Sequence, residues 1–111
     1  MIRHNAVSAW FERPENQSLE GEREVDARLD FDLPKDAAAA EVAVYLRPGS
    51  GACLVFDGPD PGQPEHYAFE VPGVYFQGRV NLNPAGRFRL RPSAGASVRL
   101  QRLGCVGYYL A

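Results

Sequence analysis

Three arginines near the end of the chain have the spacing of a binding surface. Arg87, Arg89 and Arg91 alternate with apolar residues, and because successive side chains of a β-strand point to opposite faces, the three guanidinium groups would emerge on one face. A guanidinium presents a planar fork of donors that fits carboxylates, phosphates and sugar hydroxyls. The row therefore predicts a site that grips such a ligand, and Arg99 would extend it on the next strand.

The same row has a simpler interpretation as one half of a set of ion pairs. Residues 1–70 hold all 14 acidic residues, whereas residues 71–111 hold six arginines and no acidic residue. This split is typical of two halves whose strands lie side by side with their outward charges facing each other. The acids with matching spacing are Asp26, Asp30 and Asp32. Exposed pairs of this kind are individually weak, so both interpretations stay open.

Two aromatic residues are a second kind of binding candidate. Trp10 and Tyr75 each lie beside an irregular polar segment, which favours exposure of their rings. Sugar rings stack on Trp and Tyr faces, while nearby polar side chains bind the hydroxyls. We expect most of the other tyrosines to belong to the core or its cover, namely Tyr45, Tyr67, Tyr108 and Tyr109.

Asp57 and Asp60 lie at the start of a segment rich in Gly and Pro. Together with loop carbonyls, their carboxylates could hold a hard cation such as calcium. Asp is also a common turn-forming residue, which is the competing explanation. Calcium is the only cofactor that the sequence suggests.

The remaining reactive residues form no catalytic motif. His4 and His66 are far apart, and none of the serines lies in a Gly-x-Ser-x-Gly elbow. Cys53 and Cys105, with those histidines, are too few and too scattered for a zinc site or for the metal centre of a cupin-like enzyme. We expect the two cysteines to be reduced and to pack as small hydrophobes, and we expect no enzymatic activity.

The elements that position these residues are predicted to be short strands. Residues 24–33 alternate strictly between apolar and polar types, which is the period of a half-buried strand. Ala37 to Ala40 has helical propensity and predicts a helical turn, and Pro48 to Gly51 predicts a hairpin turn. Further strands are expected at residues 41–47, 52–57, 67–71, 74–76, 79–82, 86–91, 97–103 and 106–110. Breaks at intervals of about 8 to 12 residues are typical of an all-β sandwich or barrel.

Length and charge define the class of protein further. A chain of 111 residues forms one domain, which we expect to comprise an arm or edge strand with a loop at residues 1–23 and a sandwich at residues 24–111. The net charge of -2 argues against nucleic acid as the partner. The sequence has no apolar stretch long enough for membrane insertion and no apolar signal segment at its start, so we expect a cytoplasmic location.

Three segments of the second half carry a family resemblance: His66 to Gly73, Arg87 to Pro92, and Ala96 to Leu103. They read in order as an apolar strand with a Pro/Gly turn, an Arg-Leu-Arg-x-Pro type strand, and a strand of alternating Val/Leu and Arg. This order resembles the carbohydrate-binding-like jelly-roll modules associated with bacterial glycosyltransferases of rhamnan and O-antigen synthesis. Arg91 stands where that pattern has Asp, and residues 74–84 form an insertion. The resemblance implies a noncatalytic sandwich with a glycan as ligand, and it implies no particular binding residue.

These observations predict an all-β fold, a single jelly-roll-like antiparallel β-sandwich of about eight short strands. The predicted function is noncatalytic carbohydrate recognition linked to bacterial polysaccharide assembly. The alternative is a structural or interaction sandwich that mediates oligomerisation or docks onto a catalytic domain, with no small ligand. An apolar, unpaired edge near residues 2–11 would favour that alternative.

Overall fold

The computed structural model describes residues 2–4, 9–12, 18–47, 53–60, 62–69, 75–93 and 97–110, and most of these lie in strands. The larger of two sheets contains β1 (Ile2–His4), β2 (Ala9–Glu12), β3 (Ser18–Leu19), β5 (Ala37–Arg47), β8 (Phe76–Asn81) and β10 (Val98–Leu110). The smaller sheet contains β4 (Arg23–Asp26), β6 (Cys53–Gly58), β7 (His66–Phe69) and β9 (Arg87–Pro92). One helix, α1 (Ala27–Asp30), links β4 to β5.

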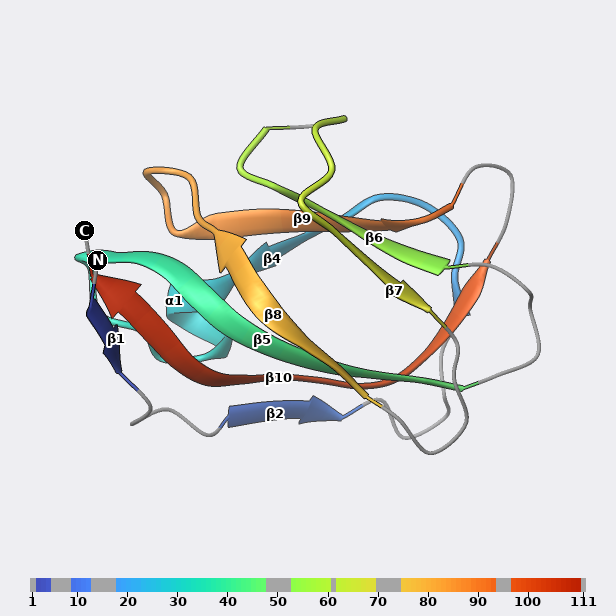
Figure 1. Cartoon of the computed structure of the whole chain (residues 1–111), viewed down its shortest axis with the longest axis horizontal. Helices are drawn as coiled ribbons and strands as arrows, with labels where there is room; N and C mark the ends of the chain where they lie inside the picture. Colours follow the sequence, from blue (N-terminus) through green and yellow to red (C-terminus); the bar gives the residue numbers. More distant parts are fainter. Residues whose placement is uncertain are drawn as a thin grey trace.

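The strand order is that of a jelly roll. The larger sheet runs β1-β10-β5-β8, with β2 and β3 also paired to β10, and the smaller sheet runs β4-β9-β6-β7. All pairings are antiparallel. From β3 onwards the chain crosses to the other sheet at every connection except β6 to β7, so the two sheets stack as a sandwich (Figure 1). This topology confirms the predicted jelly-roll-like β-sandwich.

The core lies between the inner faces of the two sheets. The Phe56 ring of the smaller sheet stacks on Phe76 of the larger sheet, with ring centroids 5.5 Å apart, and lies 6.2 Å from the Phe88 ring. Leu54 and Leu103 are fully buried beside them. Burial of each such side chain contributes about 1.5 to 3 kcal/mol, so this apolar layer is the main force that holds the sheets together.

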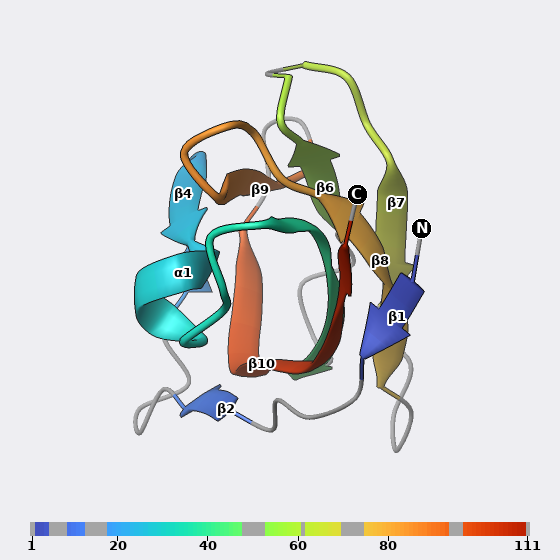
Figure 2. The same ribbon diagram turned by 90° about the vertical axis from the view of Figure 1, so that its left-hand side faces the viewer.

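The predicted strand over residues 24–33 is wrong beyond Asp26. There the chain turns into α1, because Asp26 Oδ1 accepts a hydrogen bond from the backbone N–H of Leu29 at 3.2 Å and caps the helix. Ala27 and Phe31 are buried, while Leu29 is 79% exposed. Residues four apart share one side of a helical turn, so Ala27 and Phe31 both face the core. Leu29, midway between them, is left in solvent. Figure 2 shows α1 at one end of the sandwich, next to β4.

The predicted helical turn at Ala37 to Ala40 is also wrong, because these residues begin β5. Ala39 and Ala40 are fully buried and pair with β8 on one side and β10 on the other. Intrinsic helical propensity is weak enough for such tertiary pairing to override it. The small alanine side chains suit this part of β5, where both faces of the sheet are buried.

Two predicted turns also differ from the structure. Pro48 to Gly51 lie outside the described residues, but the strands that they join, β5 and β6, belong to different sheets and form no hairpin. A break was expected at Gly104, yet β10 runs unbroken from Val98 to Leu110. Its register against β5 shifts at three places, so bulges bend the strand where the sequence suggests a break.

The ends of the described chain lie side by side. Ile2 of β1 pairs with Leu110 of β10, and both chain ends appear at the same end of the sandwich (Figure 1). No helix in the described part of the chain is long and apolar enough to span a membrane. Cys53 and Cys105 are free thiols, and they belong to different sheets.

Candidate functional site

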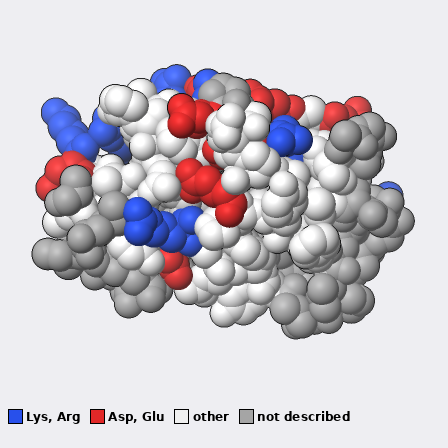
Figure 3. Space-filling model, turned by 45° about the horizontal axis from the view of Figure 1, so that its top comes forward, with Lys and Arg blue, Asp and Glu red and all other residues white. Residues whose placement is uncertain are grey.

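The three arginines of β9 lie on the outer face of the smaller sheet, as predicted. Phe88 and Leu90, the residues between them, are fully buried in the core. Antiparallel pairing places Arg87 opposite Asp26 and Arg89 opposite Glu24 on β4. Acidic and basic side chains adjoin each other on the side of the molecule that Figure 3 shows.

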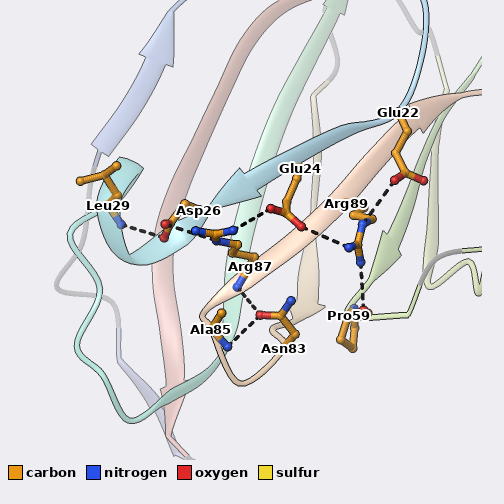
Figure 4. A network of polar contacts seen from close by, with 9 residues as sticks. All are labelled: Glu22, Glu24, Asp26, Leu29, Pro59, Asn83, Ala85, Arg87 and Arg89. Atoms are coloured by element: carbon orange, nitrogen blue, oxygen red, sulfur yellow. Dashed lines mark hydrogen bonds and ion pairs between the residues drawn. The ribbon is translucent and has the colours of Figure 1, made fainter.

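Acidic side chains of the first half of the chain neutralise two of these arginines (Figure 4). Arg87 lies 3.0 Å from Glu24 and 3.4 Å from Asp26. Arg89 lies 3.2 Å from Glu24 and 3.3 Å from Glu22, and it donates to the carbonyl of Pro59 at 3.2 Å. The expectation that the acidic and basic halves face each other is therefore confirmed.

The acids that form these pairs are only partly those predicted. Asp26 is one of them, but Asp30 lies in α1 and Asp32 follows it, both exposed. The strand ends before it can bring them opposite β9. Glu24 of β4 and Glu22, directly before β4, take their place, because the pairing with β9 covers Arg23 to Asp26.

Arg91 is held more tightly than the other two. Its Nε lies 2.7 Å from Asp57 Oδ2 and its Nη2 lies 3.2 Å from Oδ1, a forked contact that uses both carboxylate oxygens. Asp57 is fully buried at a bulge, where Phe56 pairs with Leu90 and the next paired residue is Gly58. The hydrogen bond to Asp57 raises the pKa of Arg91.

This geometry bears on the calcium hypothesis for Asp57 and Asp60. The Asp57 carboxylate already has a cationic partner in Arg91. Asp60 is exposed, and its carbonyl accepts a hydrogen bond from Gln63 in a turn, which matches the competing explanation of a turn-forming Asp. Within the described ranges, no three His, Cys, Asp or Glu side chains gather in a way that could hold a metal ion.

The outer face of the larger sheet carries a second row of side chains along β8. Tyr75, Gln77 and Arg79 are exposed, whereas Val80 is fully buried. Tyr75 is 55% exposed, as predicted for a stacking platform. Trp10 lies in β2 opposite Gly104, in the sheet row that continues through Ala43 to Gln77. The Trp10 side chain lies outside the described part of the structure.

A buried carboxylate holds this row in place. Glu41 of β5 is 8% exposed, and it accepts hydrogen bonds from the Gln77 amide at 3.0 Å and from the Tyr109 hydroxyl at 2.7 Å. Arg79 lies over the Tyr109 ring, 5.1 Å from its centroid, and donates to Asn81 at 3.0 Å. Gln77 and Arg79 are thus oriented by neighbours while they remain exposed to solvent.

A third set of exposed groups lies on β7, where Tyr67 is 52% and Phe69 is 67% exposed. The sequence predicts Tyr67 to belong to the core or its cover. The structure buries Ala68 and turns the two rings outward on the same face as the β9 arginines. The expectation that Tyr67 belongs to the core or its cover is therefore wrong.

Side chains from the smaller sheet cap the edge of β8 that does not pair with β5. Glu65 accepts hydrogen bonds from the Asn81 backbone N–H at 3.0 Å and from its side-chain amide at 3.3 Å. The His66 ring is hydrogen-bonded to the backbone carbonyl of Arg79. These contacts close one side of the sandwich and fix the backbone that carries the β8 row.

Sequence reasoning missed the cluster of Glu41, Gln77, Arg79 and Tyr109. Its signal is Glu41, an acid inside a strand that is otherwise almost entirely apolar (residues 37–46). A charged residue in such a position must find hydrogen-bond donors. Which donors they would be depends on the pairing of β5 with β8 and β10. A comparison of the chain with family models, curated proteins and solved structures finds no match.

Proposed function

We propose that this protein is a noncatalytic carbohydrate-recognition module with a role in bacterial polysaccharide assembly. The observation that carries the proposal is that Tyr75, directly before β8, is exposed together with Gln77 and Arg79 on that strand. An aromatic face and oriented planar donors are the groups that bind the apolar side and the hydroxyls of a sugar.

The rigidity of the surrounding structure supports this assignment. Glu41 and Tyr109 hold the polar side chains, and Glu65 with His66 holds the backbone of β8. A site that is fixed before the ligand arrives loses less conformational entropy on binding. We assign no catalytic step, since the His66 ring is engaged with the backbone carbonyl of Arg79.

A glycan-array screen of the purified protein tests the proposal, with and without calcium and at two salt concentrations. We expect saturable binding to a defined set of glycans that persists at high salt, since stacking and neutral hydrogen bonds are screened little. Loss of binding with a chelator would show that calcium takes part in binding. A blank array would overturn the proposal.

Single substitutions locate the site on the protein. Tyr75→Ala and Trp10→Ala should each lower glycan affinity by about 1 to 3 kcal/mol if the ring is a stacking platform. Tyr67→Ala is the matched control, because Tyr67 has a similar exposure on the other sheet. Equal affinities of all three variants and the unmodified protein, with unchanged folding, would remove both residues from the site.

The alternative function is docking to a partner protein or catalytic domain, and the exposed pair Tyr67 and Phe69 favours it. The edge formed by residues 2–11 gives it less support, since β1, β2 and β3 pair with β10 and divide that edge into short pieces, which limits strand addition. Phe69→Ser should abolish a docking interaction and leave glycan binding unchanged. Pull-down with the variants Phe69→Ser and Tyr75→Ala distinguishes the two functions, because only Phe69→Ser should lose a docking partner.

A further inference from the structure

Five arginines of the two sheets divide into two groups according to their partners. Arg87, Arg89 and Arg91, on the smaller sheet, all face carboxylates. On the larger sheet, the Arg79 side chain contacts Asn81 and the Tyr109 ring, and Arg99 is exposed. Within the described part of the chain, neither arginine forms an ion pair. The row predicted to bind a ligand is therefore neutralised, and other guanidinium groups remain available.

The outer face of the larger sheet has an excess of positive charge in a protein whose net charge is -2. By strand register three arginines lie on this face, Arg79, Arg99 and Arg102, together with two acids, Glu41 opposite Arg79 and Glu12 opposite Arg102. Glu41 is buried, and both of its oxygens already accept hydrogen bonds. Arg79 and Arg99 are the exposed guanidinium groups among the described side chains of this face.

Arg79 is held in an orientation suited to a ligand. Its guanidinium lies over the Tyr109 ring and donates to Asn81 through Nη2, which leaves further N–H groups for an incoming acceptor. A planar guanidinium matches a carboxylate in a forked contact. The Arg91 contact with Asp57 shows the same chemistry within this chain.

The spacing of the two arginines sets the size of the ligand. Arg79 pairs with Glu41 and Arg99 pairs with Arg47, six residues further along β5. At about 3.3 Å per residue, the two positions are roughly 20 Å apart along the strand. A single sugar is too small to reach both positions, whereas an extended oligosaccharide with several acidic groups can do so.

We infer that the glycan recognised by this face is acidic, an oligosaccharide that bears carboxylates and binds across β8, β5 and β10. This inference rests on the proposed carbohydrate-recognition function and adds the chemical class of the ligand. Arg79 takes one carboxylate and Arg99 another, while the Tyr75 ring stacks on a sugar.

Calorimetric titration with oligogalacturonate, and separately with its methyl ester, tests the charge of the ligand on the unmodified protein. The two probes share one backbone and differ in the carboxylate charge. We expect the acid to bind at least ten-fold more tightly than the ester, and part of its affinity to fall as salt is raised. Equal binding of dextran sulfate would show attraction to any polyanion and would overturn the inference.

Two matched variants then test the assigned residues. Arg79→Gln should weaken binding of the acid by about ten-fold or more, the effect of losing a charge-assisted hydrogen bond, and should leave binding of the ester almost unchanged. Arg87→Gln, on the opposite face, should have no effect. Ester binding equal to that of the acid, or array hits restricted to neutral glycans, would overturn this inference and leave carbohydrate recognition standing. A blank array would overturn both.

Discussion

Asp57 and Arg91 form a forked ion pair in which the carboxylate is fully buried and the guanidinium is partly exposed. The two residues come from neighbouring strands, β6 and β9, and the bulge at Asp57 places its side chain beside Arg91. A buried carboxylate with no partner is costly, so this pair ties the middle strands of the smaller sheet to each other.

Removal of Arg91 should therefore destabilise the fold far more than removal of an exposed arginine. We expect Arg91→Met to lower the free energy of unfolding by about 3 kcal/mol, because Asp57 is left charged and buried. Arg87→Met is the control, and its exposed pairs should contribute at most about 1 kcal/mol. Urea unfolding measures both values. Similar losses in the two variants would contradict this account.

The Cys105 thiol predicts a loss of stability in alkaline solution. Burial raises its pKa from 9.0 to about 11, so between these pH values the unfolded chain loses the proton while the folded chain keeps it. Stability is unaffected below about pH 9 and falls as the pH rises toward 11. With each pKa unit worth about 1.4 kcal/mol, the loss reaches up to about 3 kcal/mol.

Urea unfolding measured across this pH range tests the prediction for Cys105. Cys105→Ala should be less stable at neutral pH, because it opens a small cavity, but its stability should decline less steeply above pH 9. Parallel curves for the two proteins would show that Cys105 does not titrate as expected.

Gly58 should tolerate a side chain less well than Gly62, although both adopt positive φ, +69° and +74°. A Cβ at Gly58 would collide with the Glu65 carboxylate, whereas a Cβ at Gly62 would meet open space. We expect Gly62→Ala to cost about 1 kcal/mol from backbone strain, and Gly58→Ala to cost about 1 to 2 kcal/mol more, since Glu65 would lose its bonds to Asn81. Thermal unfolding in a Glu65→Ala background should remove the difference. If Gly58→Ala is still less stable than Gly62→Ala in the Glu65→Ala background, the clash does not involve Glu65.

Asp26 has two roles that substitution can separate. It caps α1 through Leu29 and lies 3.4 Å from Arg87. Asp26→Ser keeps a capping oxygen and loses the charge, whereas Asp26→Ala loses both. We expect the alanine variant to be less stable than the serine variant by about 1 kcal/mol in denaturant unfolding. Equal stabilities would mean that the cap contributes nothing measurable.

The strand content and the two-sheet architecture could be predicted because the signals are local. Alternation at residues 87–91 and the regular breaks follow from the two-residue period of a strand, and the sheets formed as expected. Residues 27–33 show where this reasoning fails, since apolar residues at every second position also satisfy a single helical turn. In the structure, the cap at Asp26 favours the helical turn over a continued strand. In the sequence, the longer alternating pattern is the stronger signal and predicts the strand.

The candidate site was less predictable because it depends on which strands become neighbours. The β9 row was placed on the correct face, yet its charges are neutralised by β4 and β6. The polar neighbours of Tyr75 in the sequence predict its exposure. The orientation of Arg79 instead depends on Tyr109, Asn81 and the pairing of three strands. Such long-range pairing leaves no local periodic signal.

The central role of β10 has a consequence for how the protein is made. Strands β1, β2 and β3 all pair with β10, and so does β5, so the first residues of the chain find their partners only among residues 98–110. Residues 98–110 are synthesised after every other described strand, so the earlier strands remain without this neighbour while the chain grows. Pairing over such sequence distances is slow, and we expect the larger sheet to assemble only once residues 98–110 have been synthesised.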